Sequence, residues 1–135
     1  MSRVLIVDDD AADLELLKAY LEETVDELCC VNDSRKAEHA FVEFEPDLVV
    51  LDLRMPAPDG FEVLRRLRGP RVSLGYLPVI VLSGDNSHVA RNSALILGAD
   101  EFVNKPVDRD ELVIRVRNLL RTRRTYMAAK EGRAD

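Results

Sequence analysis

Aspartates stand at the ends of two apolar segments of this sequence. The apolar run at residues 4–7 ends in Asp8 and Asp9, and the run at residues 48–51 ends in Asp52. Continuous Val, Ile and Leu runs are typical of strands buried on both faces of a parallel sheet. Functional groups gather beyond the carboxyl ends of such strands, so we expect an acidic cluster with Asp52 at the centre of its chemistry. Because carboxylates repel one another, such a cluster persists where a cation or a chemical task compensates.

A hydroxyl and an ammonium are expected at the same edge of the sheet. Ser83 follows the apolar run at residues 78–82, and Lys105 follows a short apolar segment at residues 100–103. Mg²⁺ prefers oxygen ligands and usually keeps several waters, so one or two carboxylates and a phosphate are enough to bind it. A metal and a lysine neutralise phosphoryl oxygens, and a hydroxyl hydrogen-bonds to one of them. The residue set therefore predicts a site for a phosphoryl group.

Strand-like and helix-like segments alternate five times along the chain, with no linker long enough to separate two domains. Five βα units of this kind specify an α/β fold with a doubly wound parallel sheet. We expect the flavodoxin-like strand order 2-1-3-4-5, with helices on both faces. The expected strands are 3–7, 27–31, 46–51, 78–82 and 100–103, and the expected helices are 11–23, 35–44, 61–67, 86–97 and a last one that opens at Asp108 or Asp110.

Several residues are expected to begin or end these helices. Asp10 is interpreted as a helix cap rather than a metal ligand, and Ser34 as the cap of the second helix. Asp59 is assigned to a turn before Gly60, and Gly69-Pro70 to the end of the third helix. The last residues, from about Ala128 to Asp135, are expected to be frayed.

The composition fits one globular domain with no membrane segment. The chain has 135 residues, 47% of them hydrophobic and 33% charged, and a net charge of −6. Residues 1–60 carry a balance of −11 and residues 61–135 a balance of +5, so the acidic half is not expected to bind nucleic acid directly. Cys29 and Cys30 are adjacent on a strand, where they cannot form an ordinary disulfide. The absence of a cleavable signal and of a disulfide framework favours the cytoplasm.

The motifs together resemble the receiver domains of bacterial two-component response regulators, with a chemotaxis-regulator-like architecture. The resemblance covers about Arg3 to Leu120. The division that follows is a receiver domain at residues 1–122 and, at 123–135, an extension of the last helix with a frayed tail. It rests on motifs that occur in order at the strand ends: Val7-Asp8-Asp9-Asp10, Leu51-Asp52-Leu53-Arg54-Met55-Pro56 with Asp59-Gly60, Leu82-Ser83-Gly84, Gly98-Ala99-Asp100-Glu101-Phe102 and Lys105-Pro106.

The resemblance implies that Asp52 accepts a phosphoryl group from a phosphohistidine. It also implies that Asp8, Asp9 and Asp52 hold Mg²⁺ together with the backbone carbonyl of Arg54, and Mn²⁺ can take its place. The expected partner is a sensor histidine kinase or a histidine phosphotransfer protein. The protein would catalyse its own phosphorylation and slow dephosphorylation, and would otherwise be a switch rather than an enzyme.

Three further residues have roles that only the resemblance implies. Lys105 and Ser83 would contact the phosphoryl group, and Phe102 occupies the position of an aromatic switch residue. The Lys105-Pro106 peptide bond is expected to be cis, which proline allows.

Phosphorylation would then change the face formed by the fourth helix, the fifth strand and the fifth helix. This face would control a downstream protein target or an output domain that is missing from this chain, and a homodimer can form through it. The last helix can also extend past Thr122 to Ala129 as a dimerising stalk. We expect no direct contact with nucleic acid or membranes.

Three other functions are compatible with part of this pattern. A degenerate receiver would serve only as a protein-docking module, which the intact acids, Ser83 and Lys105 argue against. A dehalogenase-like phosphohydrolase would carry a second acid where this chain has Arg54, and the chain lacks a cap domain. A flavodoxin-like redox module would need a phosphate-cradling loop where this chain has repelling acids. We hypothesise instead that Arg54 shapes access to the phosphoryl group and hence its lifetime.

Overall fold

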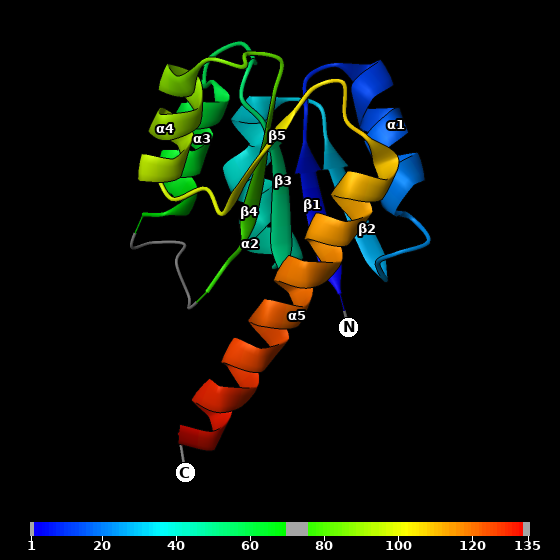
Figure 1. Cartoon of the computed structure of the whole chain (residues 1–135), viewed down its shortest axis with the longest axis vertical. Coiled ribbons are helices and arrows are strands. Elements are labelled where there is room, and N and C mark those ends of the chain that lie inside the picture. The colour runs from blue at the N-terminus through cyan, green and yellow to red at the C-terminus, as the bar shows by residue number, and fades with distance from the viewer. Residues whose placement is uncertain (1, 70–75, 134–135) are drawn as a thin grey trace.

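Figure 1 shows a parallel sheet flanked by helices, with one long helix projecting beyond the sheet. The computed structural model describes residues 2–69 and 76–133. Strands and helices alternate as the sequence predicts. The strands are β1 (Arg3–Val7), β2 (Glu27–Val31), β3 (Leu48–Asp52), β4 (Val79–Ser83) and β5 (Glu101–Asn104). The helices are α1 (Ala11–Leu21), the 3₁₀ turn η1 (Ser34–Lys36), α2 (Ala37–Phe44), α3 (Gly60–Leu67), α4 (His88–Ile96) and α5 (Arg109–Arg133).

All five strands are parallel and lie in the order β2-β1-β3-β4-β5, which confirms the predicted fold. The register aligns the strand ends: Val7 pairs with Leu51, and Asp52 pairs with Leu82. Because parallel strands end at the same edge, residues 8, 52 and 83 lie within one or two positions of one another across the sheet. The edge that carries the predicted site is therefore set by backbone pairing.

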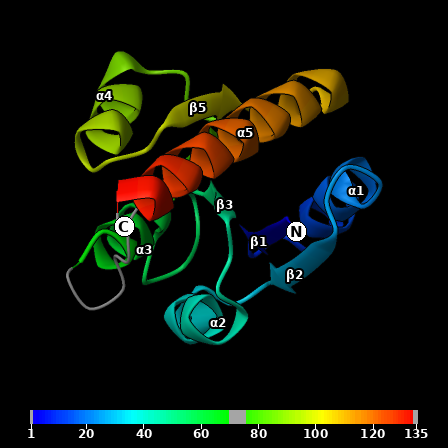
Figure 2. The same ribbon diagram turned by 90° about the horizontal axis from the view of Figure 1, so that it is seen from below.

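The sheet is buried on both faces, as the continuous apolar runs predict. Leu5 and Val7 face α2, α3 and α4, whereas Val4 and Ile6 face α1 and α5. Figure 2 shows these two layers of helices on opposite sides of the strands. Alternate residues of one run thus enter two different cores, which is why these strands read as apolar at every position. Among the described residues, no helix has the length and apolar character needed to span a bilayer.

Helix starts agree with two predictions and correct two others. The Asp10 carboxylate accepts hydrogen bonds from the backbone N–H groups of Ala12 and Asp13, so it caps α1. Asp108 caps α5 by accepting from the N–H of Glu111. The turn assigned to Asp59 is itself a helix start, since its carboxylate caps α3 at the N–H of Glu62.

The predicted cap at Ser34 is wrong. Asp33 accepts from the N–H of Arg35 and begins η1, and α2 starts only at Ala37. The buried Ser34 hydroxyl instead donates to the carbonyl oxygen of Pro56. It therefore ties the start of this helical segment to the loop that follows β3, and a neighbouring carboxylate takes over the capping role.

The predicted fraying from Ala128 is also wrong for the described residues, because α5 continues to Arg133. Ala, Lys, Glu and Arg are good helix formers and make up most of this segment. Two contacts hold α5 to the domain just before this segment. Arg123 pairs with Asp47 at 2.9 Å, and the ring of Tyr126 packs edge-on against that of Tyr76, with 5.7 Å between the ring centroids. Residues 134 and 135 lie outside the described residues, and the division after residue 122 stays a prediction.

Arg68 joins α3 to the turn between α4 and β5. Its guanidinium donates to the carbonyl oxygens of Gly98 and Leu77 and to the carboxylate of Asp100. Gly98 has φ +105, and a Cβ there would press against the Arg68 side chain. The helix α3 ends at Leu67 with Arg68 as its cap, and Pro70, which was expected to end it, lies outside the described residues.

Gly60 is required by the close approach of α3 to the end of β3, and Gly60→Ala tests this. An added Cβ would overlap the carbonyl oxygen of Asp52 and the Cα of Leu53. We expect a loss of about 2 kcal/mol or more in the free energy of unfolding, measured by urea denaturation. Gly84→Ala is the control, since a Cβ there has no atom within 4 Å and should change stability by less than about 1 kcal/mol. Equal stabilities for the two variants would contradict this account.

Candidate functional site

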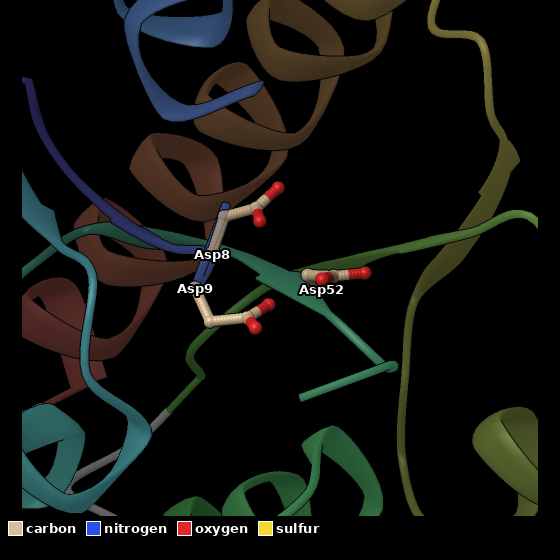
Figure 3. A group of neighbouring side chains, drawn as sticks. All are labelled: Asp8, Asp9 and Asp52. Carbon is tan, nitrogen blue, oxygen red and sulfur yellow. The ribbon is translucent and has the colours of Figure 1, made fainter. Parts of the chain in front are cut away.

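Three carboxylates converge at the carboxyl edge of the sheet (Figure 3). Asp8 and Asp9 follow β1, and Asp52 is the last residue of the neighbouring strand β3. One oxygen from each lies within 4.8 Å of the others. Asp8 and Asp52 are 0% and 3% exposed, whereas Asp9 is exposed. The predicted acidic cluster is present, with two carboxylates in the protein interior and one exposed to solvent.

Lys105 supplies the positive charge of this cluster. It follows β5, and its peptide bond to Pro106 is cis. Its Nζ atom lies 3.2 Å from Asp8 Oδ2, 3.3 Å from Asp52 Oδ1 and 3.0 Å from Asp13 Oδ2. Burial opposes the charged form, but the hydrogen bond to Asp13 and the charges of Asp52 and Asp8 outweigh it and raise the pKa of Lys105. The lysine is therefore a permanent cation.

The two buried carboxylates are harder to ionise than ordinary aspartates. Burial raises the pKa of Asp8 to about 6, and the nearby charge of Asp52 adds to this, although hydrogen bonds from the Asp10 N–H and from Lys105 oppose it. Burial likewise raises the pKa of Asp52, against the favourable charge of Lys105. Two buried carboxylates thus share one ammonium, and a further cation would relieve the remaining negative charge.

Ser83 and Arg54 lie beside Asp52 on the α3 and α4 side. Ser83 is the last residue of β4 and is buried, and its hydroxyl accepts a hydrogen bond from the N–H of Asp85 at 3.0 Å. The N–H of Arg54 donates to Asp52 Oδ1 at 3.3 Å, and its side chain is exposed. Both residues line an open pocket of about 230 Å³ together with Asp59 and Asp85.

Phe102 lies on β5 and is 8% exposed. Its ring belongs to the core under α3 and α4, and the guanidinium of Arg91 on α4 lies 5.9 Å from the ring centroid. Phe102 is thus held between the sheet and α4. Its role as a switch residue stays a prediction.

The residues present fit a hard divalent cation. The cluster offers only carboxylate oxygens, which Mg²⁺ and Mn²⁺ prefer, and its exposed member leaves room for the waters that Mg²⁺ retains. The excess of negative charge around one lysine also favours the binding of a cation. The carbonyl of Arg54 as a ligand remains a prediction from the resemblance.

Asp13 was missed in the sequence analysis. It lies in the first turn of α1, and its carboxylate makes the shortest of the three contacts to Lys105. A usable signal existed, because an acid in the first turn of a helix that follows β1 must lie at the same edge as Asp8. The sequence separation of 92 residues hid the partner.

The family model described as the response regulator receiver domain matches residues 4–117. Among curated relatives, the transcriptional regulatory protein AruR of Pseudomonas aeruginosa is 39% identical, covering 94% of this chain and 52% of its own length. The transcriptional regulatory protein TrcR of Mycobacterium tuberculosis is also 39% identical, covering 88% and 45%. The chain therefore spans about half the length of the curated relatives it matches.

This chain matches solved structures of similar fold over almost their whole length. The receiver domain of the Francisella response regulator 1452 superposes with a TM-score of 0.82 at 31% identity, covering 90% of this chain and 98% of that one. The BeF₃-activated N-terminal receiver domain of Klebsiella pneumoniae RstA gives a TM-score of 0.81 at 29% identity, covering 89% and 99%. The sequence and the fold thus lead to the same group of proteins.

Metal binding can be tested through stability. Mg²⁺ at ten times its dissociation constant should stabilise the fold by about 1.4 kcal/mol, a rise of about 5 °C in Tm. Asp9→Asn should remove most of this rise. It should also stabilise the metal-free protein by up to about 1 kcal/mol, because it removes one charge from crowded carboxylates.

Calorimetry with and without Mg²⁺ measures both effects. The control is Glu15→Gln, which removes an exposed acid of α1 outside the cluster and should leave the Mg²⁺ response unchanged. A metal-free Asp9→Asn protein that is less stable than the wild type would show that Asp9 has a structural role.

Proposed function

This chain belongs to the family of response regulator receiver domains, and on that premise we propose that Asp52 accepts a phosphoryl group from a phosphohistidine. Receiver domains are signalling domains of two-component systems. The observation that carries the proposal is the buried Asp52 carboxylate, 3.3 Å from the Lys105 ammonium and beside two more carboxylates. The phosphoryl donor would be a sensor histidine kinase or a histidine phosphotransfer protein.

In the proposed transfer, an Asp52 carboxylate oxygen attacks phosphorus while the phosphorus–nitrogen bond to the donor imidazole breaks. The imidazole leaves with the bonding electron pair, and Asp52 becomes an acyl phosphate. Lys105 is already at the site, so its charge is in place when phosphoryl oxygens arrive, with little rearrangement. Ser83 is one strand away, and its hydroxyl can turn from its contacts with Asp85 to donate to a phosphoryl oxygen.

Asp8, Asp9 and Asp52, with the carbonyl of Arg54, would hold Mg²⁺, or Mn²⁺ in its place. Such an ion neutralises charge on the transferred group and orients it for in-line attack. The chain's own residues set the charge and the hydration of the site. Lys105 contributes a positive charge, and the burial of Asp8 and Asp52 keeps water from surrounding these two carboxylates.

The proposed response to phosphorylation is a change in the α4–β5–α5 face. A phosphoryl group adds about −1.5 to −2 charge and three acceptor oxygens. Movement of Ser83 towards it would pull the segment from Gly84 to Val89, which is exposed throughout. The Phe102 ring packs in the core with Ala94 of α4 and lies near Arg91 of the same helix, so its packing can follow a movement of α4. The site would bias a preexisting equilibrium of the face.

The output would be binding to another protein or to an output domain. Apolar side chains of α4 and α5 are exposed at Val89, Ile96 and Ile114, and such residues suit a protein contact, including a homodimer. We expect no nucleic-acid or membrane contact by this domain itself. We propose a cytoplasmic location, which suits the two free cysteines Cys29 and Cys30.

In the alternative interpretation, the protein is a degenerate receiver that accepts no phosphoryl group and only binds a partner protein through its surface. The full set of Asp8, Asp9, Asp52 and Lys105 within contact distance weighs against it. Family membership also leaves no support for the redox or dehalogenase-like alternatives.

Intact mass after incubation with acetyl phosphate tests the proposal. The wild type with Mg²⁺ should gain one phosphoryl group, and Asp52→Asn should gain none. Omission of Mg²⁺ should also prevent the gain. If the wild type gains no mass and binds no beryllofluoride, the docking-only alternative becomes the better interpretation.

Arg54 gives a prediction for the lifetime of the phosphoryl group. Its exposed side chain lines the open pocket next to Asp52, which Asp85 also lines. Arg54→Ala should therefore raise the rate of dephosphorylation by about two-fold or more, because it opens the approach of water to the acyl phosphate. The loss of phosphoryl mass over time measures this rate, and Arg65→Ala, on an exposed part of α3, is the control. Identical rates for Arg54→Ala and the wild type would refute the hypothesis.

A further inference from the structure

Lys105 has three carboxylate partners, and one of them lies outside the acidic cluster. Asp8 and Asp52 belong to the cluster, whereas Asp13 belongs to helix α1 and makes the shortest contact, at 3.0 Å. We propose that Asp13 is a positioning residue for phosphoryl transfer: it anchors the Lys105 ammonium at the site while the other two carboxylates are engaged in the reaction. The inference rests on the proposed function and assigns a role to a residue outside the expected site.

The position of Asp13 is fixed by the backbone. Its N–H donates to the carboxylate of Asp10, which caps α1, and the N–H of Asp10 in turn donates to Asp8 at 3.0 Å. The start of α1 is thereby tied to the acidic cluster through two consecutive hydrogen bonds. The Asp13 carboxylate is therefore presented at a defined place rather than on a mobile loop.

The hydrogen-bond count of the ammonium shows why this anchor matters. Lysine has three N–H donors, and three carboxylates lie within 3.3 Å of Nζ. Lys105 donates hydrogen bonds to Asp8 and Asp13 and forms an ion pair with Asp52. A phosphoryl group on Asp52 needs at least one of these donors. Asp52 becomes an acyl phosphate, and Asp8 is a proposed metal ligand, so both can release the lysine. Asp13 takes part in neither role, and its contact can persist throughout.

Two opposing effects of Asp13 have to be compared. Its negative charge repels an incoming phosphoryl group, but its side chain is 44% exposed, so solvent screens that repulsion. The Lys105 side chain is 22% exposed and among the most flexible of all residue types. An anchor that removes this flexibility before the reaction lowers the ordering cost at the transition state. We therefore expect the anchoring effect to dominate.

The first measurement needs neither metal nor phosphoryl donor. In metal-free protein, NMR of lysine ammonium groups reports a held lysine by its slow proton exchange. We expect a protected Lys105 signal in the wild type, assigned by its loss in Lys105→Arg. The signal should exchange faster in Asp13→Ala and recover in Asp13→Glu. An equally protected signal in Asp13→Ala would overturn the anchor.

The second measurement uses beryllofluoride, a phosphoryl mimic, in the presence of Mg²⁺. Asp13→Ala should weaken its binding about five-fold, the scale of a partly exposed charged pair. With acetyl phosphate, the rate at saturating donor should fall by a similar factor, with little change in the half-saturating concentration. Asp13→Glu, which keeps the charge and can reach Lys105, should restore both quantities to within two-fold.

Control variants separate anchoring from charge and folding. Glu15→Gln removes one acid from an exposed position of α1 and should match the wild type within two-fold. Asp13→Asn keeps the shape and should lie between the wild type and Asp13→Ala, which covers the case in which Asp13→Ala does not fold. Wild-type-like or tighter beryllofluoride binding by Asp13→Asn and Asp13→Ala would overturn the inference alone. A wild type that neither binds beryllofluoride nor gains a phosphoryl group would overturn the proposed function and this role with it.

Discussion

Crowding of negative charge around a single ammonium is the constraint on which the rest of this structure depends. Parallel pairing places the ends of β1 and β3 side by side, so Asp8 and Asp52 must meet at one edge. Both are almost completely buried, and the pKa of each is raised. Lys105 is the cation that makes the arrangement tolerable, and it comes from the loop after β5. The sheet therefore gathers charges that the connections must then balance.

The need to neutralise the buried carboxylates also explains why residues far apart in the sequence form the site. The start of α1 contributes two hydrogen bonds and a carboxylate, and the strands contribute the buried acids. The opposite end of the sheet is held separately by Arg68, which bonds to Gly98, Leu77 and Asp100. The turn after α4 is therefore fixed, whereas the segment before α4 is exposed. A change at the acidic cluster would therefore reach α4 at the end that the Arg68 hydrogen bonds do not hold.

The sequence was sufficient for features that depend on short-range patterns. Apolar runs located β1 and β3 to within two residues of their observed starts, and their carboxylate endings located the cluster. Features that depend on distant partners were not accessible. Asp13 meets Lys105 across 92 residues, and Arg68 meets Gly98 across 30. Ser34 was misassigned because its hydroxyl bonds to Pro56, a contact made by tertiary folding rather than by local capping.

Helix α5 leaves the domain with a fixed rotational phase. Arg123 and Tyr126 hold it against Asp47 and Tyr76, and the helix then continues unbroken to Arg133. Each further residue advances about 1.5 Å and turns about 100° around the axis. The orientation around the helix axis of any segment joined to α5 would thus be set by the number of intervening residues. Insertion of one residue would redirect it by about a quarter turn, whereas insertion of seven would nearly restore its heading.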